Sequence, residues 1–594
     1  MLKPPLFKTI TVEKILVIFS FFVVALLVFF RVRDPDFFWH LANGRAMLEQ
    51  GRIINEEIFS YTRQGVPFSN HAWLAEVLFY LIFKSWGLPG IVAFKTAIVL
   101  GIAFFIYKTS RFAGAGPLFS ALIQITVILA GVWRYGERPE IFSLFFFSLT
   151  VFLLFGFRAK KLSRRYLFLI PVVMVLWDSL HGAVYGLFLL LAFITGETVA
   201  ETVRNIRMKE KDYACCKTLW VMLAVTLAAM TINPYGLRSY DFFLAFFKPN
   251  FMTSTMTELM PPTLSIFPLY FALLSGTAVL TAIFITKPDI TQLFILVPLA
   301  ILSLRHSRVT VIFELATVPA LVYYKSLISE RIKGETVNKW FRRINYLALL
   351  AVFLFIFWLK FPPSDMELGY ELYGPFYPIG STRFIEASNL EGNMYNPGNF
   401  GGYLAYHLYP KRRIFLYCHH TVFGDLPNVV QDRSVLNRYN IQYAVLERIW
   451  GDSESYGDIF HNDEWVPVFW DDTSFVVVRN TTENRDFLAK NRLHYFSPEI
   501  LDALKITKSN PRANPQILNA YESDPTILPV LTREIGRCLS YYKDDSLAYY
   551  LGHLLSLPQN PISPDERVAI AASALKYNPS VTPLVLVDKI FPNR

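Results

Sequence analysis

The chain has 594 residues, of which 53% are hydrophobic and 16% are aromatic, and its formal net charge is +10. Apolar runs of membrane-spanning length recur through 1–361, which excludes a water-soluble fold for that part. The positive charge does not indicate a nucleic-acid partner, because the Lys and Arg residues cluster in short loops between these runs. We therefore predict a multi-pass protein of the lipid bilayer.

The first apolar run, 15–31, follows a short basic leader and lacks a small-residue cleavage site. We expect an uncleaved anchor with a cytoplasmic N-terminus. Asp34, Asp36 and His40 follow directly, and ionisable groups at a membrane face are functional candidates. A structural role is the alternative, because Asp36 is well placed to cap a helix over 37–50 and Asp34 precedes a proline.

The remaining hydrophobic runs predict ten further spans. They are 90–108, 117–132, 140–157, 166–180, 183–203, 217–232, 265–286, 289–304, 309–325 and 344–361. The segment 70–86 is apolar over only about a dozen residues, which is too short to cross comfortably. If it crossed, the basic loop at 158–165 would lie outside, against the positive-inside rule. We therefore predict a lateral amphipathic helix within an outer loop, 32–89.

With this topology, polar residues from separate loops share the outer face. They are His71 and Glu76 in the first outer loop, Arg134, Glu137 and Arg138 in the second, and Asp178, His181, Arg305, His306 and Arg308 at later span ends. Each one alone has an ordinary explanation, such as a snorkelling arginine or an interfacial position. The inner loops are merely basic, so any chemistry is expected outside the cytoplasm.

Beyond the last span the composition changes, and an odd number of spans places this part outside the cytoplasm. A small α/β domain is predicted over 362–485. Its expected strands are 413–417, 443–446 and a hairpin over 466–478. The Gly401-Gly402 pair, with tyrosines nearby, either forms a tight turn or lines an acceptor groove.

The last part, 486–594, is predicted to be helical. Segments 547–555 and 571–579 resemble a tetratricopeptide-like helix pair, which would bind a partner or cap the α/β domain. The four cysteines show no disulfide framework. Cys418 precedes two histidines, but no second Cys/His pair follows at ligand spacing, so the sequence does not predict a metal centre there.

Several motifs together carry a resemblance to a known superfamily. They are Asp34-Pro35-Asp36-Phe37-Phe38-Trp39-His40, Phe59-Ser60-Tyr61-Thr62, Asn70-His71-Ala72-Trp73, Arg138-Pro139-Glu140, His181-Gly182, Asn233-Pro234-Tyr235-Gly236 and Gly401-Gly402-Tyr403-Leu404. With its lateral helix and about eleven spans, the chain resembles the GT-C superfamily of polyprenyl-phosphate-sugar-dependent glycosyltransferases, and more closely a group of bacterial GT-C-like membrane proteins. The resemblance covers residues 10–480. It implies a polytopic α-helical membrane fold, with 1–361 as the GT-C-like domain.

The resemblance also implies roles for the polar residues of the outer face. In that superfamily an acidic residue of the first outer loop is the general base, and Asp34 and Asp36 match this position. Such a carboxylate would take the acceptor's proton while the anomeric carbon is attacked, with inversion. The leaving polyprenyl phosphate would be stabilised by cationic side chains, for which the candidates are Arg134, Arg138, Arg305, His306 and Arg308. The expected substrate contacts are His40, His71, Glu76, Glu137, Asp178 and His181.

The implied activity is sugar transfer from a polyprenyl-phosphate-linked donor to an envelope glycan, glycolipid or protein at the outer face of the plasma membrane. The sequence does not require a metal, although Asp34 and Asp36 could hold Mg or Mn together with Glu137 or Asp178. A Trp-Trp-Asp-Tyr-Gly motif is absent, so asparagine glycosylation is not expected. The alternatives are a flippase of lipid-linked glycans, which internal repeats would favour, and a non-catalytic envelope scaffold.

Overall fold

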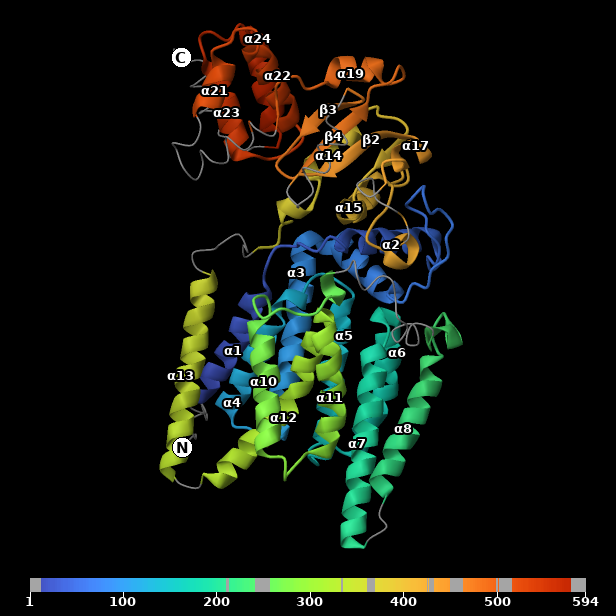
Figure 1. Ribbon diagram of the computed structural model, residues 1–594, viewed down its shortest axis with the longest axis vertical. Coiled ribbons are helices and arrows are strands. Elements are labelled where there is room, and N and C mark those ends of the chain that lie inside the picture. The colour runs from blue at the N-terminus through green and yellow to red at the C-terminus, as the bar shows by residue number, and fades with distance from the viewer. Residues whose placement is uncertain are drawn as a thin grey trace, which may run out of the picture. The chain divides into compact units, whose positions relative to one another are not determined.

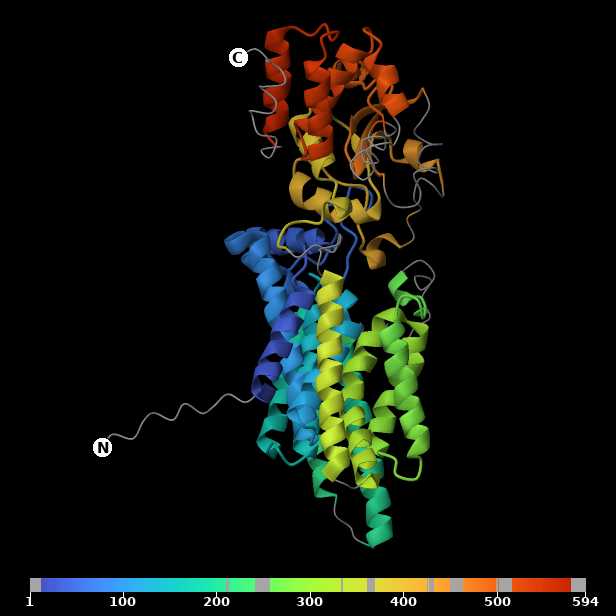
Figure 2. The ribbon, with the colours of Figure 1, turned by 90° about the vertical axis from the view of Figure 1, so that its left-hand side faces the viewer.

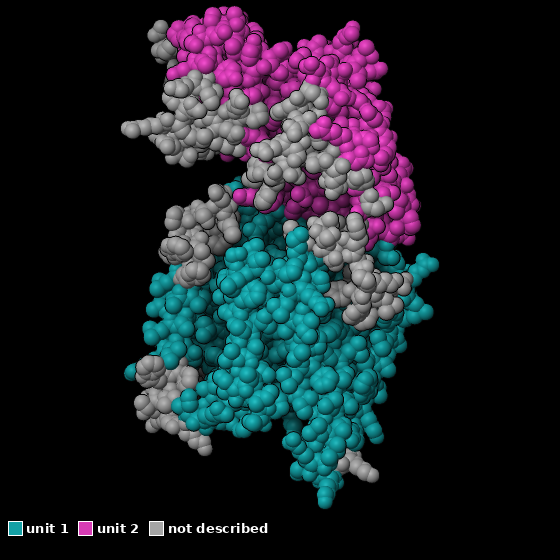
Figure 3. Space-filling model, in the orientation of Figure 1, with its two compact units in different colours: residues 1–34, 43–54, 69–372 teal, residues 35–42, 55–68, 373–594 magenta. Residues whose placement is uncertain are grey.

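The computed structural model describes residues 12–209, 213–240, 257–332, 335–360, 369–424, 426, 432–448, 463–497, 500 and 515–577. The chain divides into two compact units (Figure 3). The first consists of 1–34, 43–54 and 69–372, and the second of 35–42, 55–68 and 373–594. Two segments of the first outer loop therefore fold with the C-terminal part of the chain.

The first unit is a bundle of long helices that lie side by side (Figures 1 and 2). They are α1 (Val12–Val28), α3 (Trp73–Phe112), α4 (Pro117–Ala130), α5 (Glu140–Arg158), α6 (Leu169–His181), α7 (Val184–Met208), α8 (Ala214–Met230), α10 (Pro268–Ile283), α11 (Ile290–Arg305), α12 (Thr310–Arg331) and α13 (Glu335–Lys360). Short 3₁₀ helices connect them: η1 (Val132–Arg134), η2 (Arg164–Phe168), η3 (Gly236–Arg238), η5 (Thr257–Leu259) and η6 (Ser307–Val309).

These helices occupy the ranges that the hydrophobic pattern predicts as spans. Within the described residues, 4 helices are long and apolar enough to cross a membrane: α3, α5, α7, and α12 together with η6. Other apolar helices, such as α4, α8, α10 and α11, are shorter by the same measure. The structure thus has the mostly helical architecture expected of a membrane protein, and the number of eleven spans stays a prediction.

Helix α3 is kinked at Gly87, whose φ is 61° and ψ is −154°. Glycine adopts this conformation at low steric cost, and Pro89 follows two residues later. The kink separates an arm 73–86 from the long arm 88–112. The buried residues of the short arm are Ala75, Glu76, Phe79 and Ile82, whereas Leu81 and Trp86 are exposed. This one-sided burial fits the amphipathic helix predicted over 70–86, and its position on the outer face stays a prediction.

Helix α2 (Phe37–Gln50) has the bounds that the sequence predicts. It begins directly after Asp36, whose backbone carbonyl accepts a hydrogen bond from the His40 amide at 3.3 Å. It ends before Gly51, which has a φ of 63°. A left-handed glycine after the last helical residue is a common helix stop, because it lacks the Cβ that opposes this conformation.

The second unit contains a sheet of four strands within the described residues. They are β1 (Asn393–Tyr395), β2 (Ile441–Glu447), β3 (Trp465–Trp470) and β4 (Ser474–Arg479), in the order β1-β2-β4-β3. β1 pairs with β2 in parallel, and the other two pairs are antiparallel. The strand predicted at 443–446 and the hairpin predicted over 466–478 are both present. In the hairpin turn, Asp471 Oδ1 accepts the Thr473 amide at 2.8 Å.

Two other predictions for this unit are wrong. In 413–417 only Ile414 pairs, in an isolated bridge with Ser60, so this run is not a regular strand. Gly401 and its neighbour lie inside helix α15 (Gly398–Leu408), not in a turn. A Cβ on Gly401 would lie 2.0 Å from the Leu416 carbonyl oxygen. Glycine is needed here because the helix backbone packs directly on the backbone of a neighbouring segment.

The segments of the first outer loop that belong to this unit are held by long-range hydrogen bonds. The Tyr61 hydroxyl donates to the Met394 carbonyl at 2.9 Å, and the Ser60 hydroxyl donates to the Phe415 carbonyl at 2.7 Å. The Tyr417 hydroxyl donates to Glu57 Oε2 at 2.6 Å. Burial raises the pKa of Glu57, although this bond and two backbone amides act in the opposite direction.

The remaining elements of the second unit are helical: η7 (Gly374–Phe376), α14 (Ile379–Ala387), α16 (His420–Phe423), α17 (Val435–Arg438), α19 (Arg485–Asn491), α21 (Pro515–Glu522), α22 (Leu528–Leu539), α23 (Asp545–Ser556) and α24 (Pro564–Leu575). Helices α23 and α24 fall on the predicted helix pair, whose Asn578-Pro579 end lies outside the described residues. A tetratricopeptide repeat is not shown by these helices. None of the four cysteines, all of which are described, is in a disulfide bond.

Candidate functional site

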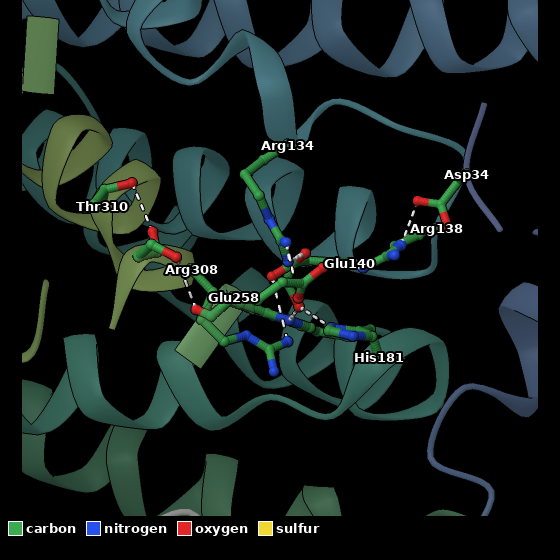
Figure 4. A network of polar contacts seen from close by, with 11 residues as sticks. Asp34, Arg134, Arg138, Glu140, His181, Glu258, Arg308 and Thr310 are labelled. Atoms are coloured by element: carbon green, nitrogen blue, oxygen red, sulfur yellow. Dashed lines mark hydrogen bonds and ion pairs between the residues drawn. The ribbon is translucent and has the colours of Figure 1, made fainter. Parts of the chain in front are cut away.

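Six charged side chains from distant parts of the sequence meet in the first unit, and we call them the arginine cluster (Figure 4). Its cations are Arg134, Arg138 and Arg308, and its anions are Asp34, Glu140 and Glu258. Arg134 ends η1, Glu140 begins α5 and Arg308 lies in η6. Each residue stands at or beside a helix end, so the loops gather charges that the apolar helix interiors exclude.

The cluster is connected by ion pairs. Arg134 pairs with Glu140 and, at 2.9 Å, with Glu258. Arg138 pairs with both Asp34 and Glu258. Arg308 Nη2 lies 3.5 Å from Glu140 Oε1. Three positive and three negative charges therefore balance in one connected group.

Exposure varies across the cluster. The Arg134 and Glu140 side chains are 5% and 6% exposed, whereas those of Arg138, Arg308 and Glu258 are 26%, 28% and 29% exposed. Burial by itself raises the pKa of Glu258, but the three arginines lower it more, to well below its usual range. The more exposed side of the cluster thus presents Arg138, which pairs with the ionised Glu258, and Arg308, which pairs with Glu140.

Backbone hydrogen bonds fix the turn that carries Glu258 against the turn that carries Arg308. The Ser307 amide donates to the Met260 carbonyl at 2.9 Å, and the Ser307 hydroxyl donates to the Glu258 carbonyl at 3.0 Å. His306 Nδ1 lies 2.9 Å from the Leu259 carbonyl oxygen. His306, predicted to bind phosphate, therefore holds the Glu258 turn through its Nδ1 atom.

Arg305, also predicted to bind phosphate, lies outside the arginine cluster. It is the last residue of α11 and is exposed, and among the described residues it makes no ion pair with the cluster. The structure thus gives these three sequence neighbours different surroundings. Arg308 belongs to the arginine cluster, His306 contacts the Glu258 turn, and Arg305 is exposed.

Two predicted histidines come together elsewhere in the first unit. The ring centroids of His71 and His181 are 5.7 Å apart. Ser143 Oγ lies 2.9 Å from His181 Nδ1 and accepts a hydrogen bond from Trp177 Nε1 at 2.7 Å. The buried indole and serine therefore fix the orientation of the His181 ring.

The three other predicted acids of this unit each have a polar partner. Glu76 accepts hydrogen bonds from the side-chain amides of Asn70, at 2.6 Å, and Asn43, at 3.2 Å. Glu137 lies 2.5 Å from Lys95 Nζ, and both are buried. Asp178 accepts from the Asn233 amide at 3.0 Å. These contacts fasten helix ends together, as buried polar groups need partners.

Asp36 and His40 belong to the second unit. His40 is buried, and its ring centroid lies 3.6 Å from that of Trp39. The Cys418 thiol in this unit donates a hydrogen bond to Asn399 Oδ1 at 3.5 Å. The side chain of His420 lies outside the described ones.

The predicted option of a divalent cation does not fit this arrangement. Mg or Mn requires several oxygen ligands around one point. Asp34 is paired with Arg138, Glu137 with Lys95, and Asp178 with an amide, so their carboxylates face different partners. Throughout the part of the chain that is described, no group of three or more His, Cys, Asp and Glu side chains is placed to hold a metal.

Sequence reasoning missed Glu258 and Lys95. No motif surrounds Glu258, and Lys95 stands in an apolar run that the sequence marks only as a span. Charge balance is the signal that could have found both residues. Arginines and glutamates in apolar surroundings need oppositely charged partners, and Glu137 and the arginines had none assigned.

Comparisons with known proteins concern the fold. No family model matches the chain, and no curated protein matches it. The archaeal oligosaccharyltransferase AglB from Archaeoglobus fulgidus, in complex with an inhibitory peptide and a dolichol-phosphate, has a TM-score of 0.50 at 10% identity, over 73% of this chain and 69% of that chain. The apo form of the oligosaccharyltransferase of that organism has a TM-score of 0.49 at 10% identity, over 80% and 75%. ArnT from Cupriavidus metallidurans, bound to undecaprenyl phosphate, has a TM-score of 0.45 at 12% identity, over 79% and 98%. The first of these shows that the chain shares the fold of that oligosaccharyltransferase.

Proposed function

We propose that this protein is an integral-membrane glycosyltransferase of the GT-C type. It transfers a sugar from a polyprenyl-phosphate-linked donor to an envelope glycan, glycolipid or protein acceptor at the outer face of the plasma membrane. The observation that carries the proposal is the arginine cluster with Asp34 at its edge, in a fold shared with an oligosaccharyltransferase that was solved with dolichol-phosphate. Such a cluster supplies both a phosphate site and a candidate base.

The cluster offers donors for a phosphate. Arg308 Nε is buried and has no hydrogen-bond partner among the described residues. Guanidinium groups bind phosphate through paired, charge-assisted hydrogen bonds. The cluster is already neutral, so a phosphate gains most when it takes the place of the Glu258 carboxylate, which pairs with Arg134 and Arg138 and interacts electrostatically with Arg308. The requirement to displace Glu258 favours a ligand with more charge than a carboxylate.

Asp34 is the proposed general base. It removes the proton of the acceptor hydroxyl as that oxygen forms its bond to the anomeric carbon of the sugar. The bond from this carbon to the phosphate oxygen breaks, and polyprenyl phosphate leaves with the electron pair. Arg138, which pairs with Asp34 in the structure, orients the base and stabilises the charge that develops on the leaving phosphate.

The experiment compares Asp34→Asn with Asp36→Asn in purified full-length protein in lipid. The donor is the lipid-linked sugar that accumulates when the gene is deleted, and the readouts are sugar transfer and binding of undecaprenyl phosphate. Asp34→Asn should lower transfer by about 10² to 10⁴-fold, since the amide keeps the shape but cannot take a proton. Phosphate binding should remain.

Asp36→Asn is the matched control, because Asn caps a helix about as well as Asp and transfer should persist. Normal turnover by both variants would disprove the assignment of Asp34 as the base. Movement of the donor across the bilayer without transfer by the wild type would support a flippase instead.

A further inference from the structure

Glu314 is a buried carboxyl group that the proposed transfer does not use. It lies in α12, one helical turn after Thr310, which is labelled in Figure 4. Its exposed fraction is 0%, and neither carboxyl oxygen has a hydrogen-bond partner in the described part of the chain. An ionised carboxylate in such surroundings carries a large desolvation cost, which only a partner charge would offset.

Among the described residues, no charged side chain pairs with Glu314. Gly131 faces it with bare backbone, and a Cβ at Gly131 would lie 3.1 Å from Glu314 Oε2 and 3.0 Å from Val311 Cγ1. Two titratable side chains interact with it electrostatically, Tyr135 and Tyr270. The Tyr270 hydroxyl bonds to Ser303 Oγ at 2.8 Å, whereas that of Tyr135 is buried without a partner in the described residues.

Charged side chains on three of the elements that pack against α12 are already paired or exposed. On α3, Lys95 pairs with Glu137, and at the start of α5 Glu140 pairs with Arg134 and Arg308. On α11, Arg305 is exposed. The arginine cluster is neutral as a whole, so it has no positive charge left over to balance an ionised Glu314.

We propose that Glu314 is a proton-binding site of the membrane unit, which holds an uncharged carboxylic acid at neutral pH and is reactive toward hydrophobic carbodiimides. In that reaction the acid proton moves to a carbodiimide nitrogen, and the carboxyl oxygen bonds to the central carbon. The resulting O-acylisourea rearranges to an N-acylurea, so all atoms are retained and nothing is oxidised or reduced. The site is independent of the proposed sugar transfer.

The deciding experiment is the infrared difference spectrum between the wild type and Glu314→Gln, both as full chains in lipid at neutral pH. Gln is uncharged and similar in shape to the protonated acid, so this variant should fold. We expect the wild type to show the C=O band of a carboxylic acid, shifted in heavy water and absent from the variant. A carboxylate band in its place would overturn the proposal.

Carbodiimide labelling provides a second readout. Dicyclohexylcarbodiimide should modify Glu314 at least about tenfold more than Glu137, which is equally buried but paired with Lys95. Labelling of Glu314 should decrease as pH rises. Equal labelling of the two glutamates would count against a neutral Glu314, and labelling of neither would overturn its proposed reactivity toward carbodiimides. Gly131→Ala, which adds a methyl group against Oε2, should reduce the labelling.

Discussion

Arg308 and Arg305 are three residues apart, and the structure gives them different roles, which makes them a sharp test of the phosphate site. Arg308 is part of the arginine cluster and has a buried, unpartnered Nε among the described residues. Arg305 is exposed and outside the cluster. We expect Arg308→Ala to weaken binding of undecaprenyl phosphate strongly and Arg305→Ala to change it little.

The size of the effect follows from the environment of Arg308. Two unit charges about 4 Å apart attract by about 4 kcal/mol at the dielectric typical of a partly exposed site. Arg308 already interacts with Glu140 at 3.5 Å, so we take about half of that attraction, about 2 kcal/mol, as the loss on removing the guanidinium. This corresponds to about thirty-fold weaker binding. An exposed arginine such as Arg305 should contribute less than about twofold.

The assay is a titration of purified full-length protein in nanodiscs with undecaprenyl phosphate, at low and high salt. The neutral polyprenol, which lacks phosphate, serves as the ligand control and should bind the wild type and both variants alike. A phosphate site at Arg308 is refuted if Arg305→Ala and Arg308→Ala weaken phosphate binding equally, or if Arg308→Ala weakens polyprenol binding as much as phosphate binding. Either result would mean that the arginines act through general charge or through folding.

Two further predictions concern the cluster and the second unit. The arginines hold the folded-state pKa of Glu258 below its unfolded value of about 4.5, so its contribution to stability is present above the unfolded pKa and is lost as pH falls toward the folded value. Glu258→Gln should therefore lower the thermal midpoint at neutral pH, by an amount that shrinks in acid. The variant should also bind undecaprenyl phosphate more tightly. A midpoint difference that grows in acid would contradict this. Gly401→Ala places a methyl group 2.0 Å from the Leu416 carbonyl oxygen and should destabilise the protein by about 3 kcal/mol or more. Gly374→Ala is the control, because its methyl group meets no atom within 4 Å. Equal thermal midpoints for the two variants would show that α15 can shift.

Much of the first unit could be predicted from local patterns. Helix ranges follow the apolar runs, because a backbone in lipid must satisfy its own hydrogen bonds and therefore forms helices. The bounds of α2 follow from Asp36 and Gly51. In the second unit, the β3–β4 hairpin follows from two apolar runs around a polar turn. In each case the determining residues are neighbours in sequence.

The candidate site was only partly predictable. The sequence indicated Asp34, Arg134, Arg138 and Arg308 because each stands beside an apolar run, where an ionisable residue is conspicuous. It could not separate Arg308 from Arg305, since both end or follow the same helix, and the direction of each side chain depends on how α11 and α12 pack. Glu258 carried no local signal at all.

What the sequence by itself determined is the class of protein: hydrophobicity and the distribution of Lys and Arg indicate a helical membrane protein with charged residues beside its apolar runs. Only the tertiary structure decided which of these charges meet. Asp34 and Glu258 are more than 200 residues apart, yet both pair with Arg138. Segments 55–68 likewise fold with the C-terminal part through hydrogen bonds to Met394 and Phe415. Such pairings depend on the packing of whole helices and loops, and no periodicity or spacing within one segment records them.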